Sequence, residues 1–289
     1  MIMVTGAAGG LGGAVLARLR AVGAEVVAGS SRPDGVESPV RRVDFDDVDT
    51  MTVAMTGIRT LLLVSAGFAE DDVVMRRHRQ AIDAAVATGV RHIVYTSLIG
   101  AGDQLSIATP HRYTEALFAA APVDTTILRN GLYTELFAGE VIRAVHAGHL
   151  SVPWGTGRAY PVARDDLAAA AATVVREIDA DRAAGAQVRH AGAVYELGGP
   201  RAVGGAELAE LAARIAGRTV EYRPTALADA RAELVGFGLL PYQVGHMLST
   251  SSVIQAGLLE SSASDLPGLL GDEPSDPADV IRLAAGSLG

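Results

Sequence analysis

The chain has 289 residues, of which 49% are hydrophobic and 20% are charged, and its formal net charge at pH 7 is −9. This length suits one large domain or two closely joined ones, and the composition is that of a globular protein. The acidic balance, with no long basic cluster, argues against nucleic acid and acidic membrane surfaces as partners.

Two residue types are missing from the chain, because it contains no cysteine and all 24 of its Lys and Arg residues are arginine. Without cysteine there is no disulfide, no thiolate nucleophile and no cysteine-ligated metal. Without lysine there is no Schiff base and no phosphate-loop lysine. The sequence also lacks a His-Glu-x-x-His pattern or a carboxylate cluster with ligand spacing, so we predict no metal site.

A glycine-rich turn opens the chain. Met1–Val4 predicts a short buried strand and Leu11–Val22 predicts a helix, with glycines at positions 6, 9 and 12 at the junction. Gly6 permits the tight turn, Gly9 lets the backbone approach a pyrophosphate, and Gly12 lets the helix pack closely on the strand. The N–H groups at the helix start and the helix dipole both favour a phosphate. Strand, glycine turn and helix together predict a dinucleotide site.

The rest of the first half alternates strand and helix patterns, which predicts a doubly wound parallel sheet, the Rossmann type of α/β fold. Ligands of such sheets bind at the carboxyl ends of the strands, which directs attention to Ser65 and Thr96 among others. We expect strands at Ala24–Gly29, Val40–Phe45, Thr60–Ser65, Arg91–Thr96 and Thr125–Leu128, and helices at Asp47–Met55, Asp71–Thr88 and His111–Ala120.

The second half is less regular. We expect an NAD(P)-binding Rossmann domain over residues 1–150 and a smaller mixed α/β substrate lobe over residues 151–289, with residues 163–178 and 194–197 packing back on the first domain. The predicted elements are helices at Ala163–Ile178 and Ala206–Ala216, strands at Val194–Leu197 and Thr219–Tyr222, and a loop at Asp265–Asp279 before a terminal helix.

Residues 234–259 carry no Asp, Glu or Arg and are long enough to span a bilayer. They also contain Pro241, four glycines and a Ser-Thr-Ser-Ser run, so we predict helices buried in the second lobe, able to line a pocket. The first strand pattern begins at Met1 and leaves no room for a signal peptide, so a cytoplasmic location is expected.

The end of the second strand indicates which dinucleotide binds. Ser30-Ser31-Arg32-Pro33 offers no acid for a ribose hydroxyl but does offer two hydroxyls and a guanidinium for a 2′-phosphate. We therefore predict NADPH (NADP) as the cofactor; a solvent-facing loop arginine is the alternative for Arg32. Asp44 and Phe45 come at the end of the third strand. Either they flank the adenine, or Asp44 is a capping residue and Phe45 a core residue.

Several segments resemble the NmrA-like atypical short-chain dehydrogenases, in particular the branch of NAD(P)H:quinone oxidoreductase type 2 and triphenylmethane reductase. The resemblance is collinear from residue 1 to at least Gly238. It rests on the glycine turn Thr5-Gly6-Ala7-Ala8-Gly9-Gly10-Leu11-Gly12, on Tyr95-Thr96-Ser97-Leu98, on Arg129-Asn130-Gly131-Leu132-Tyr133-Thr134-Glu135 and on Val194-Tyr195-Glu196-Leu197.

This resemblance implies an NADPH-dependent reductase of quinones or similar conjugated acceptors, with a cleft between the two lobes. Family histidines match His78 and His111. Two departures concern Ala116, where the branch has lysine, and Gly67-Phe68-Ala69-Glu70, which replaces a serine-rich loop. The implied cofactor contacts are Gly6, Ala7, Ala8, Gly9, Gly10, Leu11, Arg32, Gly67, Asn130, Gly131, Tyr133 and Glu135.

Ordinary short-chain dehydrogenases pair a tyrosine with a lysine four residues on, and His111 and Glu115 occupy that spacing here. A quinone accepts hydride into a conjugated system, so orientation against the cofactor supplies most of the catalysis. His111, with an ordinary pKa of about 6.5, is the candidate proton donor; capping or packing at the helix start is its alternative. Glu115 lies one helical turn after His111. It either orients the imidazole or is a surface carboxylate. Tyr113 and Tyr133 are alternative donors, and Tyr133 also suits packing in the pocket.

Two further functions remain open: an NmrA-like redox-sensing regulator that binds a dinucleotide without turnover, and a biosynthetic ketoreductase, against which the missing lysine counts. The expected partner is a small-molecule electron acceptor, with neither nucleic acid nor membrane involved. A homo-oligomer is compatible with the sequence.

Overall fold

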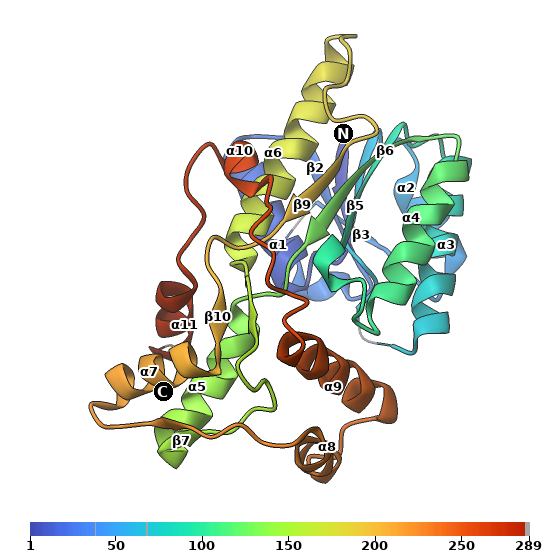
Figure 1. Cartoon of the computed structure of the whole chain (residues 1–289). Coiled ribbons are helices and arrows are strands. Elements are labelled where there is room, and N and C mark those ends of the chain that lie inside the picture. Colours follow the sequence, from blue (N-terminus) through green and yellow to red (C-terminus); the bar gives the residue numbers. More distant parts are fainter. Residues whose placement is uncertain (38, 68, 287–289) are drawn as a thin grey trace.

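The computed structural model describes residues 1–37, 39–67 and 69–286. Over these residues a sheet of seven strands forms in the order β3-β2-β1-β4-β5-β6-β9, and every neighbouring pair is parallel (Figure 1). The expected Rossmann-type α/β class is confirmed. The strands are β1 (Ile2–Val4), β2 (Val26–Ser30), β3 (Val40–Arg42), β4 (Thr60–Leu63), β5 (His92–Leu98), β6 (Asp124–Asn130) and β9 (Val194–Leu197).

Helices cover both faces of the sheet, and the alternation of side chains along each strand explains why. In β1, Ile2 and Val4 join the core beneath α1 and α6, whereas Met3 joins the core beneath α2, α3 and α4. Successive residues of a strand face opposite sides, so a strand buried on both faces is apolar throughout. The helices are α1 (Gly10–Ala21), α2 (Val48–Met55), α3 (Asp71–Ala87), α4 (Ala108–Ala120) and α6 (Arg164–Ala183).

The second lobe lies beyond the carboxyl end of the sheet (Figure 1). Its core includes Phe137 and Trp154, whose rings meet edge to face at 5.5 Å. Strand β9 returns to the main sheet beside β6, and α6 packs on α1. The lobe holds α5 (Glu135–Ala147), α7 (Gly205–Ala216), α8 (Leu227–Gly236), α9 (Pro241–Gln255) and α11 (Pro277–Gly286), with the pairs β7 (His149–Leu150) with β11 (Glu221–Tyr222) and β8 (Arg158–Ala159) with β10 (Val203–Gly204).

Three features of the second lobe differ from the expectations. Residues 135–147, expected within the first domain, form α5 and pack with α7 and α11 of the second lobe. Helix α5 lies outside the predicted elements, and the loop expected over residues 265–279 contains the short helix α10 (Leu266–Leu270), which Leu266 anchors in the core. The prediction that residues 234–259 are buried is wrong, because α8 buries no residue and Phe237 is 65% exposed. Helix α9 buries three of its residues, namely Val244, Val253 and Ile254. No helix in the described ranges has the length and apolar character that crossing a bilayer requires.

Candidate functional site

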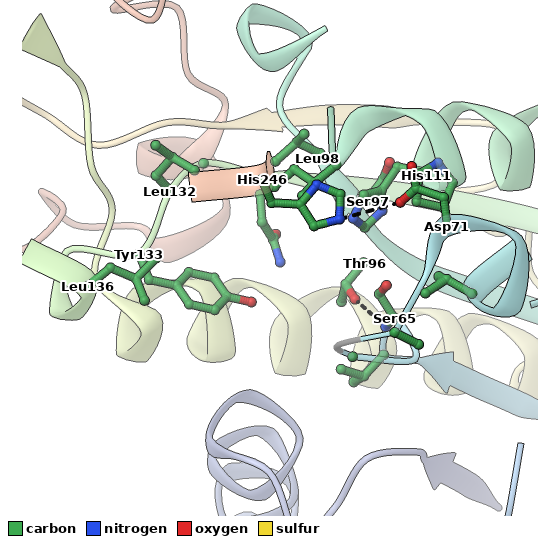
Figure 2. A pocket seen from close by; sticks show the side chains of 18 residues that line it. Ser65, Asp71, Thr96, Ser97, Leu98, His111, Leu132, Tyr133, Leu136 and His246 are labelled. Carbon is green, nitrogen blue, oxygen red and sulfur yellow. Dashed lines mark hydrogen bonds and ion pairs between the residues drawn. The ribbon is translucent and has the colours of Figure 1, made fainter. Parts of the chain in front are cut away.

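A cavity of about 280 Å³ lies at the carboxyl ends of β4, β5 and β6, where the loops of the first lobe meet α9 of the second. Most of its exposed wall is apolar, although eight of the eighteen described residues that line it carry polar side chains, several of which are labelled in Figure 2. Seven of the predicted site residues line this cavity: Ser65, Gly67, Thr96, His111, Asn130, Gly131 and Tyr133. The apolar lining includes Val64, Val74, Leu98, Ile107, Leu132 and Leu136.

The glycine turn lies after β1 and makes an open cradle. Gly6 has a φ of 61°, and a Cβ on Gly12 would lie 2.4 Å from the carbonyl oxygen of Gly6. Within the described residues no side chain caps α1, and its first turn carries no acid. The first N–H groups of a helix have no partner inside it, so this terminus offers donors to an anion. Phe68, in the loop that follows β4, lies outside the described residues.

The loop after β2 is organised around Ser30, whose buried Oγ accepts the N–H of Arg32 at 3.1 Å. The Arg32 side chain is exposed and has no ion pair among the described residues. Asp44 accepts the N–H of Asp46 at 3.1 Å, and Phe45 packs against the core beneath α2. The structure therefore gives Asp44 and Phe45 local structural contacts, and their predicted role at the adenine stays a prediction.

His111 is the fourth residue of α4, because the helix begins at Ala108, one turn before the predicted start. The side chain therefore does not cap the helix. Its Nδ1 lies 2.8 Å from the hydroxyl of Tyr95, and burial, with a smaller contribution from Arg112, lowers its pKa to about 4. The expectation of an ordinary pKa near neutrality is wrong, since an imidazolium loses its hydration in this site. At pH 7 His111 is neutral.

Glu115 belongs to an ion-pair network and has no hydrogen bond to His111 in the part of the chain described. Its carboxylate accepts Nε and Nη2 of Arg129 at 3.0 and 2.6 Å, and Oγ of Ser97 at 2.5 Å. Burial raises the pKa of Glu115, but the hydrogen bonds from Arg129 and Ser97 outweigh it and hold the pKa below its usual value. Arg129 also binds Glu196 of β9 at 2.8 Å, so the network fastens α4 to the sheet.

Tyr133 follows β6 and points its hydroxyl across the cavity towards Thr96 (Figure 2). Its hydroxyl is hydrogen-bonded to Asn130, and burial raises its pKa, so it stays protonated at pH 7. The other two predicted residues lie elsewhere. Glu135 accepts the backbone N–H of Arg164 at 3.1 Å and so caps α6, while the Tyr113 hydroxyl accepts Nε of Arg79 at 2.9 Å. Tyr113 does not line the cavity.

Sequence reasoning missed two residues that the fold brings to the site. His246 of α9 lines the cavity; its Nδ1 lies 2.7 Å from Oγ of Ser106 and its Nε2 lies 3.5 Å from Asp71. Arg164 places its guanidinium 5.3 Å over the ring of Tyr133 and against Gly10 of the glycine turn. No local pattern marks either residue, since both approach from segments far away in the chain.

Comparison with known proteins agrees with this geometry. Residues 6–178 match the model of a family described as NAD(P)H-binding. Quinone oxidoreductase 2 of Escherichia coli (strain K12) is 34% identical over 292 residues, which cover 97% of each chain. This chain belongs to the NAD(P)H-binding family.

Solved structures of this family extend the comparison. The Escherichia coli NADPH-dependent quinone oxidoreductase in complex with NADPH superposes with a TM-score of 0.87 at 31% identity, covering 98% of this chain and 99% of that one. The Citrobacter sp. triphenylmethane reductase in complex with NADP(H) gives a TM-score of 0.85 at 26% identity, covering 98% and 99%. The resemblance to this branch of the NmrA-like proteins is confirmed.

The residues present fit the dinucleotide of the family. The cradle that a Cβ on Gly12 would fill, the uncapped start of α1 and the adjacent guanidinium of Arg164 all favour a diphosphate. Arg32 lies at one end of the carboxyl edge of the sheet, after β2, and the cavity lies at the other end, beyond β4 to β6. A dinucleotide is an elongated ligand, and this edge offers it a charged end and an apolar end.

We expect Gly12→Ala to destabilise the fold by about 2 kcal/mol, because the new methyl group has no room beside the backbone of Gly6. The variant should also lose NAD(P)H affinity, as measured by fluorescence titration, alongside chemical denaturation. Gly139→Ala is the matched control: a Cβ there meets no atom within 4 Å on helix α5, and the variant should gain about 0.5–1 kcal/mol. Equal stability and affinity in Gly12→Ala would contradict the close packing.

Proposed function

We propose that this chain is an NADPH-dependent reductase that transfers hydride to a quinone or a similar conjugated small molecule. The single observation that carries this proposal is an aliphatic cavity at the carboxyl edge of a dinucleotide-binding sheet, with a neutral imidazole in its wall. NADPH supplies the hydride when bound. The structures of two relatives in complex with NADPH and with NADP(H) support the choice of cofactor.

The lining of the cavity suits a planar, apolar acceptor better than an alcohol or a ketone. Leu98, Ile107 and Leu132 offer surface to a conjugated ring, and Asn130 with Tyr133 offers polar groups on one side. No lysine exists in the chain to lower the pKa of a catalytic tyrosine, and burial raises the pKa of Tyr133. A simple ketone would need a strong proton donor at its oxygen, whereas a quinone needs orientation and modest charge stabilisation.

Two arginines are suited to the two phosphate groups of the cofactor. Arg32, exposed and unpaired among the described residues, follows β2, where the 2′-phosphate of NADPH is read in this fold. Arg164 is half-buried between Gly10 and Tyr133, has no ion pair in the described ranges, and so presents uncompensated positive charge to a diphosphate. The expected roles of Gly6, Ala7, Ala8, Gly9, Gly10 and Leu11 as backbone donors are part of this proposal.

The function has a direct test. Purified protein with NADPH and a panel of benzoquinones and naphthoquinones should lose absorbance at the reduced nicotinamide band with multiple turnovers. His111→Ala should lower kcat by about tenfold to a hundredfold while the Kd for NADPH changes by less than about twofold. Because the pKa of His111 is about 4, the wild-type rate should be flat between about pH 6 and 8.

His146→Ala is the control, since His146 is exposed on α5 and its imidazole, among the described residues, bonds Ile142 of its own helix. Tight NADPH binding with no turnover of any acceptor would contradict the reductase function and favour the redox sensor. Reduction of simple ketones in place of quinones would favour the ketoreductase. The cytoplasmic location and the oligomeric state stay predictions from the sequence.

Arg32→Ala should weaken NADPH binding by about tenfold or more, because the 2′-phosphate loses a charge-assisted hydrogen bond. NADH lacks that phosphate, so its Kd in the same variant should not change and serves as the internal control. Isothermal titration with both nucleotides measures the difference. Parallel losses for NADPH and NADH would remove Arg32 from cofactor selection.

Arg164→Gln should weaken NADPH and NADH alike, by about tenfold, because both nucleotides carry the diphosphate. This pattern differs from that of Arg32→Ala. Arg176→Gln, on the exposed side of the same helix, is the matched control and should bind both nucleotides as the wild type does. An Arg164→Gln variant with wild-type affinity for both would show that the guanidinium only packs on Tyr133.

A further inference from the structure

A chain of buried hydrogen bonds runs behind His111, away from the cavity. It joins His78 of α3 and Tyr95 of β5 to His111 and Thr114 of α4. His78 is fully buried and Tyr95 is 1% exposed. The bonds at His78 are therefore shielded from solvent, and the Tyr95–His111 bond is partly buried. In such a setting each polar hydrogen has a definite acceptor, and the protons can be assigned one by one.

Neutral His78 has its proton on Nδ1. The backbone N–H of Ala66 donates to Nε2 of His78 at 2.9 Å, so Nε2 carries no proton. Burial lowers the pKa of His78 to about 3, and the neutral ring therefore holds its proton on Nδ1. Nδ1 lies 2.8 Å from Oγ1 of Thr114, whose own hydrogen goes to the carbonyl of Pro110 at 2.7 Å. Thr114 thus accepts from His78.

Tyr95 is the next group in the series of hydrogen bonds. Its hydroxyl lies 3.4 Å from Nδ1 of His78 and 2.8 Å from Nδ1 of His111. The His78 nitrogen is already protonated, so it cannot accept the phenol hydrogen. Burial raises the pKa of Tyr95, and the phenol keeps its proton. The hydroxyls of Thr114 and Ser65 also interact with the phenol oxygen. An imidazole nitrogen is a stronger acceptor than either hydroxyl, so Tyr95 donates to Nδ1 of His111.

The remaining proton of His111 then has one place. A neutral imidazole carries a single hydrogen, and with Nδ1 accepting, that hydrogen is on Nε2. His111 lines the cavity, and its Nε2 has no protein partner in the part of the chain that the structure describes. The ring therefore offers the cavity a hydrogen-bond donor.

We propose that Tyr95 is a positioning residue that holds His111 in the Nε2–H tautomer, so that a neutral donor faces the acceptor oxygen on which charge develops. The inference rests on the proposed reductase function. Gain of a hydride, with its two electrons, converts a quinone into a hydroquinone monoanion. The oxyanion accepts the Nε2–H hydrogen bond and then takes one proton from water, so His111 keeps its own proton throughout.

The tautomer has a readout that does not depend on activity. Long-range ¹H–¹⁵N spectra of histidine-labelled protein distinguish a protonated from an unprotonated ring nitrogen, and the His111 signals are those lost in His111→Ala. In the wild type we expect protonated Nε2 and unprotonated Nδ1. A protonated Nδ1 in the wild type would overturn the proposal, whatever the activity. If the expected tautomer is found in a protein that reduces no quinone, the proposed function fails and the tautomer assignment stands.

Tyr95→Phe keeps the ring, which packs against Phe118 and His78, and removes only the hydroxyl. Its spectrum should show both tautomers of His111, and kcat should fall by about tenfold while the Kd for NADPH and the KM for the quinone stay within about twofold. Tyr195→Phe is the matched control, since Tyr195 makes an equally long 2.8 Å bond to Nδ1 of His190 outside the cavity. A single unchanged His111 tautomer in Tyr95→Phe would overturn the role of the hydroxyl.

Discussion

The parallel register of the main sheet is the constraint on which the site depends. Parallel strands end at the same edge, so the glycine turn after β1, the Ser30–Arg32 loop after β2 and the cavity beyond β4 to β6 all lie along one side. Helices on both faces leave this edge as the open part of the first lobe. The second lobe then covers it with α9, and His246 and Ser249 make polar contacts across the boundary.

The absence of lysine shapes both the fold and the site. Ordinary short-chain dehydrogenases place a lysine four residues after the catalytic tyrosine. In this chain Glu115 stands at that spacing from His111, and it is bound by Arg129 and Ser97. Arginine is suited to this task because its planar guanidinium bonds a carboxylate with two nitrogens at once. The result is a rigid anchor for α4, the helix that carries His111, in place of a proton relay.

Desolvation sets the chemistry that remains. Burial favours the neutral forms of His78, His111 and Tyr95 together, so the network behind the cavity holds protons in fixed positions at neutral pH. Fixed neutral donors are effective where charge develops on a substrate, because they need no reorganisation. This environment suits an acceptor that delocalises its charge, which agrees with the aliphatic wall of the cavity.

The sequence by itself determined the sheet, the glycine turn and the family, because local patterns specify each of them. Apolar strand runs indicate the sheet, glycine spacing indicates the turn, and the segment Arg129–Glu135 indicates the family. Seven of the residues that it pointed to line one cavity in the structure. Only the tertiary structure decided the pKa of His111 and the partners of Glu115. It also decided that Arg164 lies beside Tyr133 and that His246 lines the cavity. These depend on burial and on contacts between distant segments, and no local spacing encodes either. The exposure of Phe237 has the same origin, since an apolar run does not specify which surface will cover it.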